Sequence, residues 1–225
     1  MGKQFTLVAS DSFKLGAYRA EPAGPVKGGI VVIQEIFGVN QHIRAVCDRL
    51  AADGYVAIAP AVFDRQQPNF ECGYSPDEIA NARKFVANPD WGAMMRDTQA
   101  AIDEAKKSGP AAIIGFCMGG TIAFLAAAKL NGLSAAIGYY GGQIAKNADE
   151  KPKIPTQLHF GEKDASIPMS DVEIIKQKRG GDCEIYVYPD AQHGFHCDER
   201  GSFNEAAAKL AWQRATAFLQ KHLKK

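Results

Sequence analysis

The sequence has no excess of charge of either sign and no long apolar run. Its 26 Lys and Arg residues face 25 Asp and Glu residues, which gives a net charge of +1 at pH 7. Without a basic excess, the chain has no broad positive field to attract nucleic acid or an anionic membrane. No segment approaches the roughly 18 apolar residues of a membrane span, and residues 1–22 lack the apolar core of a signal peptide. These absences predict a cytoplasmic protein with no nucleic-acid or membrane partner.

The cysteines lack the spacing of a disulfide framework or a zinc ribbon. They form no CxxC pair and are odd in number: Cys47, Cys72, Cys117, Cys183 and Cys197. Small secreted frameworks use an even number of cysteines, and zinc ribbons use closely spaced pairs. We therefore expect reduced thiols. With 46% hydrophobic and 23% charged residues, the 225-residue chain is expected to form one globular domain over 1–225.

Short β-branched runs alternate with helical patterns along the chain. Residues 28–36 and 55–60 are nearly continuous apolar runs, typical of strands that are buried on both faces of a parallel sheet. Residues 41–54 have helical spacing and end at Gly54, which suits a C-terminal cap. Further strands are expected at 111–115, 133–141, 156–161 and 183–189, and helices near 94–107, 118–130, 168–179 and 203–222. This alternation predicts an α/β fold with a mostly parallel central sheet and helices on both faces.

A cysteine flanked by glycines follows the strand expected at 111–115. Residues 115–119 read Gly-Phe-Cys-Met-Gly, which is the nucleophile elbow of α/β-hydrolases with Cys in place of Ser. Such a turn holds its central residue in a strained conformation and leaves no room for side chains two positions away. A helix that starts at Met118 would direct its first amides at the sulfur and favour a thiolate. The pattern predicts that Cys117 is a nucleophile.

Two further side chains follow later strands. Asp164 comes just after the strand expected at 156–161, and His193 lies in the loop after the next one. Cysteine, acid and histidine then occur in the chain order of an α/β-hydrolase, each at the carboxyl end of its own strand. We expect His193 to move the proton and Asp164 to fix its tautomer. Residues 61–76, the longest irregular stretch, are expected to cover the site.

Four segments together resemble the dienelactone hydrolase family, whose members carry a Cys-Asp-His triad on an α/β-hydrolase fold. They are VIQEIFGVN (32–40), GFCMGG (115–120), IGYYGG (137–142) and AQHGF (191–195). The resemblance implies hydrolysis of a lactone or enol ester of the carboxymethylenebutenolide type, without a cofactor. The partner expected is a small-molecule ester or lactone that bears a carboxylate. The chain is expected to be a monomer or a small homo-oligomer.

The same resemblance implies roles for residues next to the elbow. Glu35 would contact the resting Cys117 thiol and act as a switch of its protonation state. The backbone amides of Ile36 and Met118 would form the oxyanion hole.

Four side chains are candidates for substrate binding. By resemblance, Arg83 and Arg200 would bind the substrate carboxylate, although arginines are more often surface charges. The rings of Phe37 and Tyr140, like that of Tyr139, are either pocket lining or core.

Other interpretations remain open. His193, His196, Cys197 and Asp198 could be taken for metal ligands, but neighbouring residues point in different directions and no matching ligands accompany them, so no metal site is predicted. The triad defines a reaction type and leaves the acyl group open, so a broader carboxylesterase or a thioesterase is an alternative. A non-catalytic binding module with a redox-sensitive thiol is another, which the ordered Asp164 and His193 disfavour.

Overall fold

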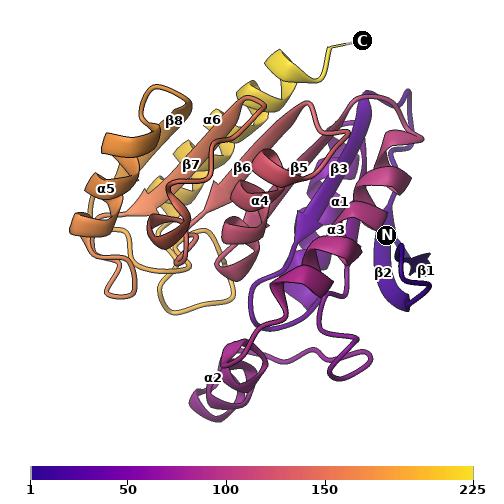
Figure 1. Cartoon of the computed structure of the whole chain (residues 1–225), viewed down its shortest axis with the longest axis horizontal. Helices are drawn as coiled ribbons and strands as arrows, with labels where there is room; N and C mark the ends of the chain where they lie inside the picture. Colours follow the sequence, from indigo (N-terminus) through magenta and orange to yellow (C-terminus); the bar gives the residue numbers. More distant parts are fainter. Residues whose placement is uncertain (1, 225) are drawn as a thin grey trace.

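A mixed sheet of eight strands runs through the middle of the computed structural model, which describes residues 2–224 (Figure 1). The strands are β1 (Lys3–Val8), β2 (Lys14–Ala20), β3 (Gly28–Ile33), β4 (Tyr55–Pro60), β5 (Ala111–Phe116), β6 (Ala135–Tyr139), β7 (Thr156–Gly161) and β8 (Cys183–Tyr188). Their order across the sheet is β1-β2-β4-β3-β5-β6-β7-β8. The pairings among β3 to β8 are parallel, whereas β1 pairs with β2 and β2 with β4 in the antiparallel sense. The prediction of a mostly parallel α/β sheet is confirmed.

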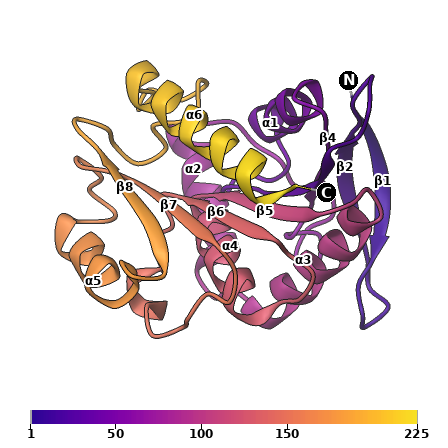
Figure 2. The same ribbon diagram turned by 90° about the horizontal axis from the view of Figure 1, so that it is seen from above.

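Helices cover both faces of the sheet, as the alternation of elements predicts. They are α1 (Gln41–Ala52), α2 (Pro76–Arg83), α3 (Trp91–Lys106), α4 (Met118–Lys129), α5 (Met169–Arg179) and α6 (Glu205–His222), with 3-10 turns η1 (Lys84–Val86) and η2 (Ala145–Asn147). Helices α1 and α6 lie on one face, and α3, α4 and α5 lie on the other (Figure 2). Within residues 2–224, no helix is both long and apolar enough to cross a membrane.

The predicted elements agree with the observed ones to within a few residues. Strands β4 and β7 occupy the predicted ranges. Gly54 follows the C-cap of α1 with a φ of +98°, a conformation that suits glycine. The strand expected at 28–36 ends earlier, at Ile33, so residues 34–36 leave the sheet. This early exit places three residues in a loop at the carboxyl edge of the sheet.

The sequence analysis missed the β1–β2 hairpin and helix α2. Strand β1 is at the edge of the sheet and most of its side chains are exposed, so it lacks the continuous apolar run of the buried strands. Helix α2 begins at the end of the stretch 61–76, which was expected to be irregular. The Ser75 hydroxyl and the Glu78 carboxylate each accept a hydrogen bond from the other residue's amide, and Pro76 occupies the first turn. This capping box is the sequence signal that identifies the helix.

Candidate active site

Three side chains from distant parts of the sequence meet at the carboxyl edge of the sheet. Cys117 directly follows β5, Asp164 follows β7, and His193 lies in the loop after β8. The Cys117 Sγ atom lies 3.1 Å from Nε2 of His193, and Asp164 Oδ2 lies 2.8 Å from Nδ1 of the same ring. The structure thus brings together the three residues that the sequence singled out, at the separations that nucleophilic catalysis requires.

Cys117 occupies a turn that only small neighbours permit. Its φ of +55° and ψ of −118° lie outside the regions that side-chain-bearing residues usually occupy. A Cβ atom on Gly115 would lie 1.9 Å from the carbonyl oxygen of Gly119, and one on Gly119 would lie 2.4 Å from that of Ile33. Both glycines are therefore required by the close approach of α4 to β5 and β3. This approach is what projects the thiol from the edge of the sheet.

Two residues that line the same cavity as the thiol have a backbone amide without an acceptor. Met118 is the first residue of α4, and Ile36 lies in the loop after β3. Within residues 2–224, neither amide N–H has a hydrogen-bond acceptor. Unpaired amides at a helix start carry a partial positive charge and stabilise an oxyanion that forms near them. The arrangement is compatible with the oxyanion hole implied by the resemblance, which stays a prediction.

Asp164 is buried and held by its own loop. Its Oδ1 atom accepts hydrogen bonds from the amides of Ser166 and Ile167 at 2.8 and 3.1 Å, which leaves Oδ2 for His193. Because a carboxylate only accepts, the contact favours a hydrogen on Nδ1 of the ring. The opposite nitrogen, Nε2, then faces Cys117.

The surroundings of His193 favour its protonated form. Burial by itself opposes the charge, but the Cys117 sulfur and the Asp164 carboxylate outweigh it and raise the pKa of His193 to about 10. An imidazolium beside a cysteine stabilises the thiolate. At neutral pH the imidazolium is therefore the favoured form of His193.

Glu35 pairs with Arg200 instead of with the thiol. The Glu35 Oε1 atom accepts a hydrogen bond from Nη1 of Arg200 at 3.0 Å, and the carboxylate is 1% exposed. Burial opposes the charge on Arg200, but the Glu35 carboxylate outweighs it and the pKa of Arg200 is raised. Within residues 2–224, no hydrogen bond joins Glu35 to Cys117: Arg200 donates to Oε1 of Glu35, and the Cys117 thiol contacts His193. The role of Glu35 as a thiol switch stays a prediction.

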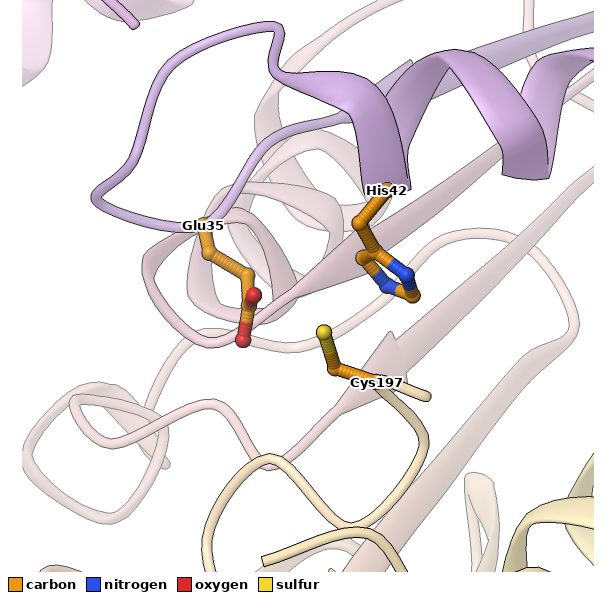
Figure 3. Close-up of side chains that lie close together, drawn as sticks. All are labelled: Glu35, His42 and Cys197. Carbon is orange, nitrogen blue, oxygen red and sulfur yellow. The ribbon is translucent and has the colours of Figure 1, made fainter. Parts of the chain in front are cut away.

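Glu35 also belongs to a second buried cluster, with His42 and Cys197 (Figure 3). One carboxylate oxygen, one imidazole nitrogen and the sulfur all lie within 4.8 Å of one another. Burial, reinforced by Glu35, raises the pKa of the Cys197 thiol to about 12. The residues of the segment 193–198 that could be taken for metal ligands point to different places. His193 faces Cys117, whereas Cys197 faces Glu35 and His42. Sequence reasoning missed this cluster because its members come from three separate elements.

A cavity of about 740 Å³ opens over Cys117. His193 and the oxyanion candidates Ile36 and Met118 line it together with the thiol. A group of apolar lining residues comes from α2, η1, the segment between η1 and α3, and the first residue of α3: Ile79, Val86, Ala87, Pro89 and Trp91. The sequence analysis did not identify these apolar lining residues.

The substrate-binding candidates fall into two groups. Arg83, Arg200 and Phe37 all line the cavity. Tyr140 does not: it is fully buried, and its ring packs edge-on against the His193 ring at 5.1 Å between centroids. The structure therefore places Tyr140 against the His193 ring, and its role in substrate binding stays a prediction. Within the described chain, the stretch 61–76 contributes no lining residue, and the cover comes from the helix that follows it.

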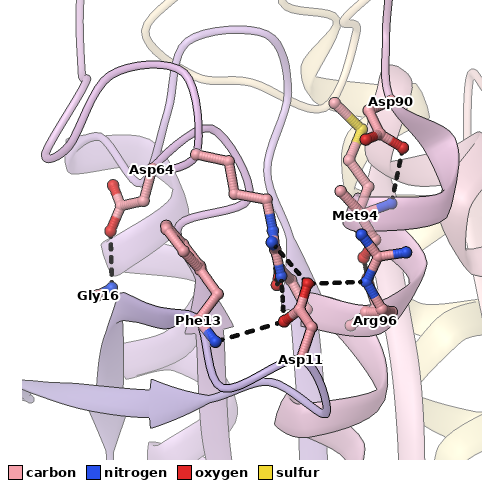
Figure 4. Close-up of polar contacts among 11 residues, drawn as sticks. Asp11, Phe13, Gly16, Asp64, Asp90, Met94 and Arg96 are labelled. Carbon is pink, nitrogen blue, oxygen red and sulfur yellow. Dashed lines mark hydrogen bonds and ion pairs between the residues drawn. The ribbon is translucent and has the colours of Figure 1, made fainter.

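The loop that leads into α2 is anchored by a buried carboxylate. Asp97 of α3 is 1% exposed and accepts hydrogen bonds from Nε and Nη2 of Arg65 at 2.9 and 2.7 Å. Burial raises the pKa of Asp97, and Arg65 partly offsets this effect. The same guanidinium donates to Asp11, which also accepts hydrogen bonds from Arg96 and from the Phe13 amide (Figure 4). The network ties the segment that precedes α2 to α3 and to the β1–β2 turn.

Comparison with known proteins gives one consistent family. The model of the dienelactone hydrolase family matches residues 15–223. A Synechocystis sp. protein provisionally named carboxymethylenebutenolidase is 41% identical, over 96% of each chain. A Pseudomonas putida carboxymethylenebutenolidase is 31% identical, over 93% of this chain and 92% of the relative. The crystal structure of a provisionally named dienelactone hydrolase from Klebsiella pneumoniae superimposes with a TM-score of 0.84 at 32% identity, covering 98% of this chain and 99% of that one.

The titration of His193 tests the electrostatics of the site. In the wild type we expect a midpoint near 10, far above the ordinary value of 6.5. Cys117→Ala removes the partner that raises the pKa most, so its midpoint should fall by more than about one pH unit, and Asp164→Asn should also lower it. NMR of the labelled imidazole nitrogens measures the three midpoints, with His222 as an internal control that should not change. A wild-type midpoint near 6.5 would contradict the assignment.

The anchoring of the loop is tested by removing Arg65. Arg65→Met leaves Asp97 buried without its partner, and we expect the free energy of unfolding to fall by roughly 2 to 3 kcal/mol, at or below the lower end for a broken buried pair because Arg65 is partly exposed. Arg96→Met is the matched control. It removes only a solvent-exposed pair with Asp11 and should cost less than about 1 kcal/mol. Urea denaturation at pH 7 measures both, and equal losses would show that Asp97 does not depend on Arg65.

Proposed function

Because the chain belongs to the dienelactone hydrolase family, we propose that it hydrolyses a lactone or enol ester that carries a carboxylate, with Cys117 as the nucleophile. Membership of the family makes the protein a carboxylic ester hydrolase that acts on esters or lactones. The observation that carries the finer proposal is the 3.1 Å separation between Cys117 Sγ and His193 Nε2, with Asp164 2.8 Å from the other ring nitrogen. All three groups lie at or next to the cavity.

The first half of the reaction forms a thioester. The Cys117 thiolate attacks the ester carbonyl carbon, and the negative charge that develops on the carbonyl oxygen is stabilised by the amides of Ile36 and Met118. His193, already protonated, donates its Nε2 proton to the leaving oxygen as the carbon–oxygen bond breaks. In a lactone the leaving oxygen stays attached to the same molecule, so nothing leaves the cavity at this stage.

The second half releases the acid. The now neutral His193 accepts a proton from a water molecule, which attacks the thioester carbonyl. Collapse of the intermediate breaks the carbon–sulfur bond and restores the thiolate and the imidazolium. Asp164 keeps the ring in one orientation throughout, because two backbone amides hold its carboxylate. No group outside this chain and water is needed for the atoms to balance.

The cavity suggests which esters the site prefers. Arg83 and Arg200 both line it, and Arg83 forms no ion pair within residues 2–224, so its charge is available to a substrate carboxylate. Charge-assisted hydrogen bonds from arginine to a carboxylate are among the stronger polar contacts. The apolar lining residues Ile79, Val86 and Trp91 favour a second candidate function, a broader carboxylesterase for uncharged esters. The two candidates differ in whether the substrate needs its charge.

Removing the nucleophile tests the mechanism. We expect Cys117→Ala to lower kcat/KM for an activated ester by at least about a thousandfold, because each member of a catalytic triad typically contributes several orders of magnitude. Cys72→Ser is the matched control, since this half-buried thiol lies outside the cavity, and it should keep activity within about twofold. Circular dichroism checks the fold of each variant. Residual hydrolysis within about tenfold of the wild type would exclude Cys117 as the nucleophile.

The charge preference is tested with a lactone acid and its methyl ester. In the wild type, one arginine contact worth roughly 1.5 to 3 kcal/mol predicts about a ten- to hundredfold higher kcat/KM for the acid. Arg83→Ala should reduce this ratio, mainly through KM, whereas Lys84→Ala, which removes a neighbouring charge outside the cavity lining, should not. Arg83 is the better target than Arg200, because loss of Arg200 would leave Glu35 buried without its partner. Equal values for the acid and the ester in the wild type would favour the broader carboxylesterase.

A further inference from the structure

We propose that Glu35, His42 and Cys197 form a binding site for one divalent transition-metal ion, with Zn²⁺ as the expected occupant. This site is distinct from the thiol and imidazole proposed for hydrolysis. It goes beyond the proposed function, which needs no metal ion.

The three side chains converge from different elements. Glu35 lies in the loop after β3, His42 in the first turn of α1, and Cys197 in the loop between β8 and α6, and Figure 3 shows all three pointing toward one another. Their exposed fractions are 1%, 0% and 0%, respectively. One ligand atom of each lies within 4.8 Å of the other two.

Two of these groups have a buried atom without a partner. Within residues 2–224, neither Oε2 of Glu35 nor Nε2 of His42 makes a hydrogen bond. Nδ1 of His42 lies 3.3 Å from the carboxylate of Asp198, which can only accept, so the ring hydrogen belongs on Nδ1 and the lone pair on Nε2. Two buried acceptors without a donor then belong to side chains of one tight cluster. This arrangement is unfavourable unless something positive lies between them.

A metal ion satisfies both acceptors at once. Sulfur, imidazole nitrogen and carboxylate oxygen are the three ligand types that Zn²⁺ takes in proteins, and three protein ligands leave a fourth position for water. The contact from Asp198 to the far nitrogen of His42 is the arrangement that usually orients a metal-bound histidine. Bonds of about 2.0 to 2.3 Å to tetrahedral zinc hold the ligand atoms roughly 3.3 to 3.8 Å apart. Because the ligand atoms lie within 4.8 Å of one another, no separation would have to shorten by more than roughly 1 to 1.5 Å.

The charges of the site also match a divalent ion. On binding, the Cys197 thiol releases its proton to solvent, so that the ligands carry two negative charges, on the thiolate and on the Glu35 carboxylate. The Asp198 carboxylate beside His42 balances the positive charge of Arg200 beside Glu35. Glu35 can keep its bond to Arg200, because that bond uses Oε1 and leaves Oε2 for the ion.

One competing arrangement satisfies the same atoms. A proton on Nε2 of His42, accepted by Glu35, would remove the conflict between the two acceptors without any metal. Such a shared proton does not need the Cys197 sulfur, whereas a metal ion binds it directly. The test therefore depends on a signal from the sulfur.

Cobalt titration of the full chain provides that signal. The Cys117→Ser protein is used so that the cavity thiol cannot bind the metal. We expect one equivalent of Co²⁺ to produce a sulfur-to-cobalt charge-transfer band, and one equivalent of Zn²⁺ to abolish it by displacement. Adding Cys197→Ser should remove the band, and adding His42→Gln should weaken Zn²⁺ binding by at least about a hundredfold. Cys72→Ser in the same background is the matched control and should leave both unchanged.

A substitution of Asp198 provides a second test in case the variants of the buried residues His42 and Cys197 do not fold. Asp198→Asn changes a half-exposed residue, and the loss of an orienting partner should weaken Zn²⁺ binding by about 10- to 100-fold with an unchanged circular dichroism spectrum. The proposal is overturned if the Cys117→Ser protein binds neither ion, which would leave the shared proton as the explanation. It is also overturned if binding persists without the charge-transfer band, or if the Asp198 variant binds as tightly as its parent.

Discussion

The contact between α4 and the sheet at Cys117 is the constraint on which the rest of the site depends. Three backbone segments approach closely here, because a Cβ atom on Gly119 would lie 2.4 Å from a carbonyl oxygen of β3 and one on Gly120 would lie 2.4 Å from a carbonyl oxygen of β6. The Cys117 amide adds a hydrogen bond to the Tyr139 carbonyl at 3.0 Å. Helix α4 consequently packs against three strands, β3, β5 and β6, and Lys129 is its only exposed residue. The thiol and the first amide of the helix have little freedom to move relative to the sheet.

The charged groups at this edge are buried together with partners, and these partners explain why the groups stay charged. A buried charge is strongly unfavourable alone and tolerable with a partner. Asp164 accepts hydrogen bonds from two backbone amides and contacts Nδ1 of His193, and Glu35 accepts a hydrogen bond from Arg200. The low polarity that would suppress an isolated imidazolium strengthens its interaction with a neighbouring sulfur and carboxylate. The raised pKa of His193 is the net result.

The proposed reactive groups and the apolar residues that line the cavity are located on different parts of the fold. The reactive groups follow strands of a sheet whose hydrogen bonds hold them in place, whereas much of the apolar cavity lining comes from α2, η1 and the approach to α3. That second part is not in the sheet, and the Arg65–Asp97 pair ties the loop before it to α3. Changes in α2 can thus alter which ester fits without moving the thiol. Such a separation is common in folds that support many substrates.

Much of this protein could be predicted from the sequence because the signals are local. Apolar periodicity identified the six strands from β3 to β8, and the need for small residues around a strained turn identified Cys117. The order of Asp164 and His193 along the chain then placed them at the same edge, since parallel strands end together. The edge hairpin was not predicted, because its strands are only partly buried and lack a continuous apolar run. Helix α2 was not predicted either, although its capping box is visible in the sequence.

Only the tertiary structure decided the partners of the remaining side chains. It paired Glu35 with Arg200 instead of with Cys117, packed the Tyr140 ring against the His193 ring, and brought Glu35, His42 and Cys197 together. These contacts depend on where β3 leaves the sheet and on how the loop before α6 folds back over it. No local sequence pattern predicts these contacts, because the side chains involved lie far apart in the chain and meet only when the sheet is assembled.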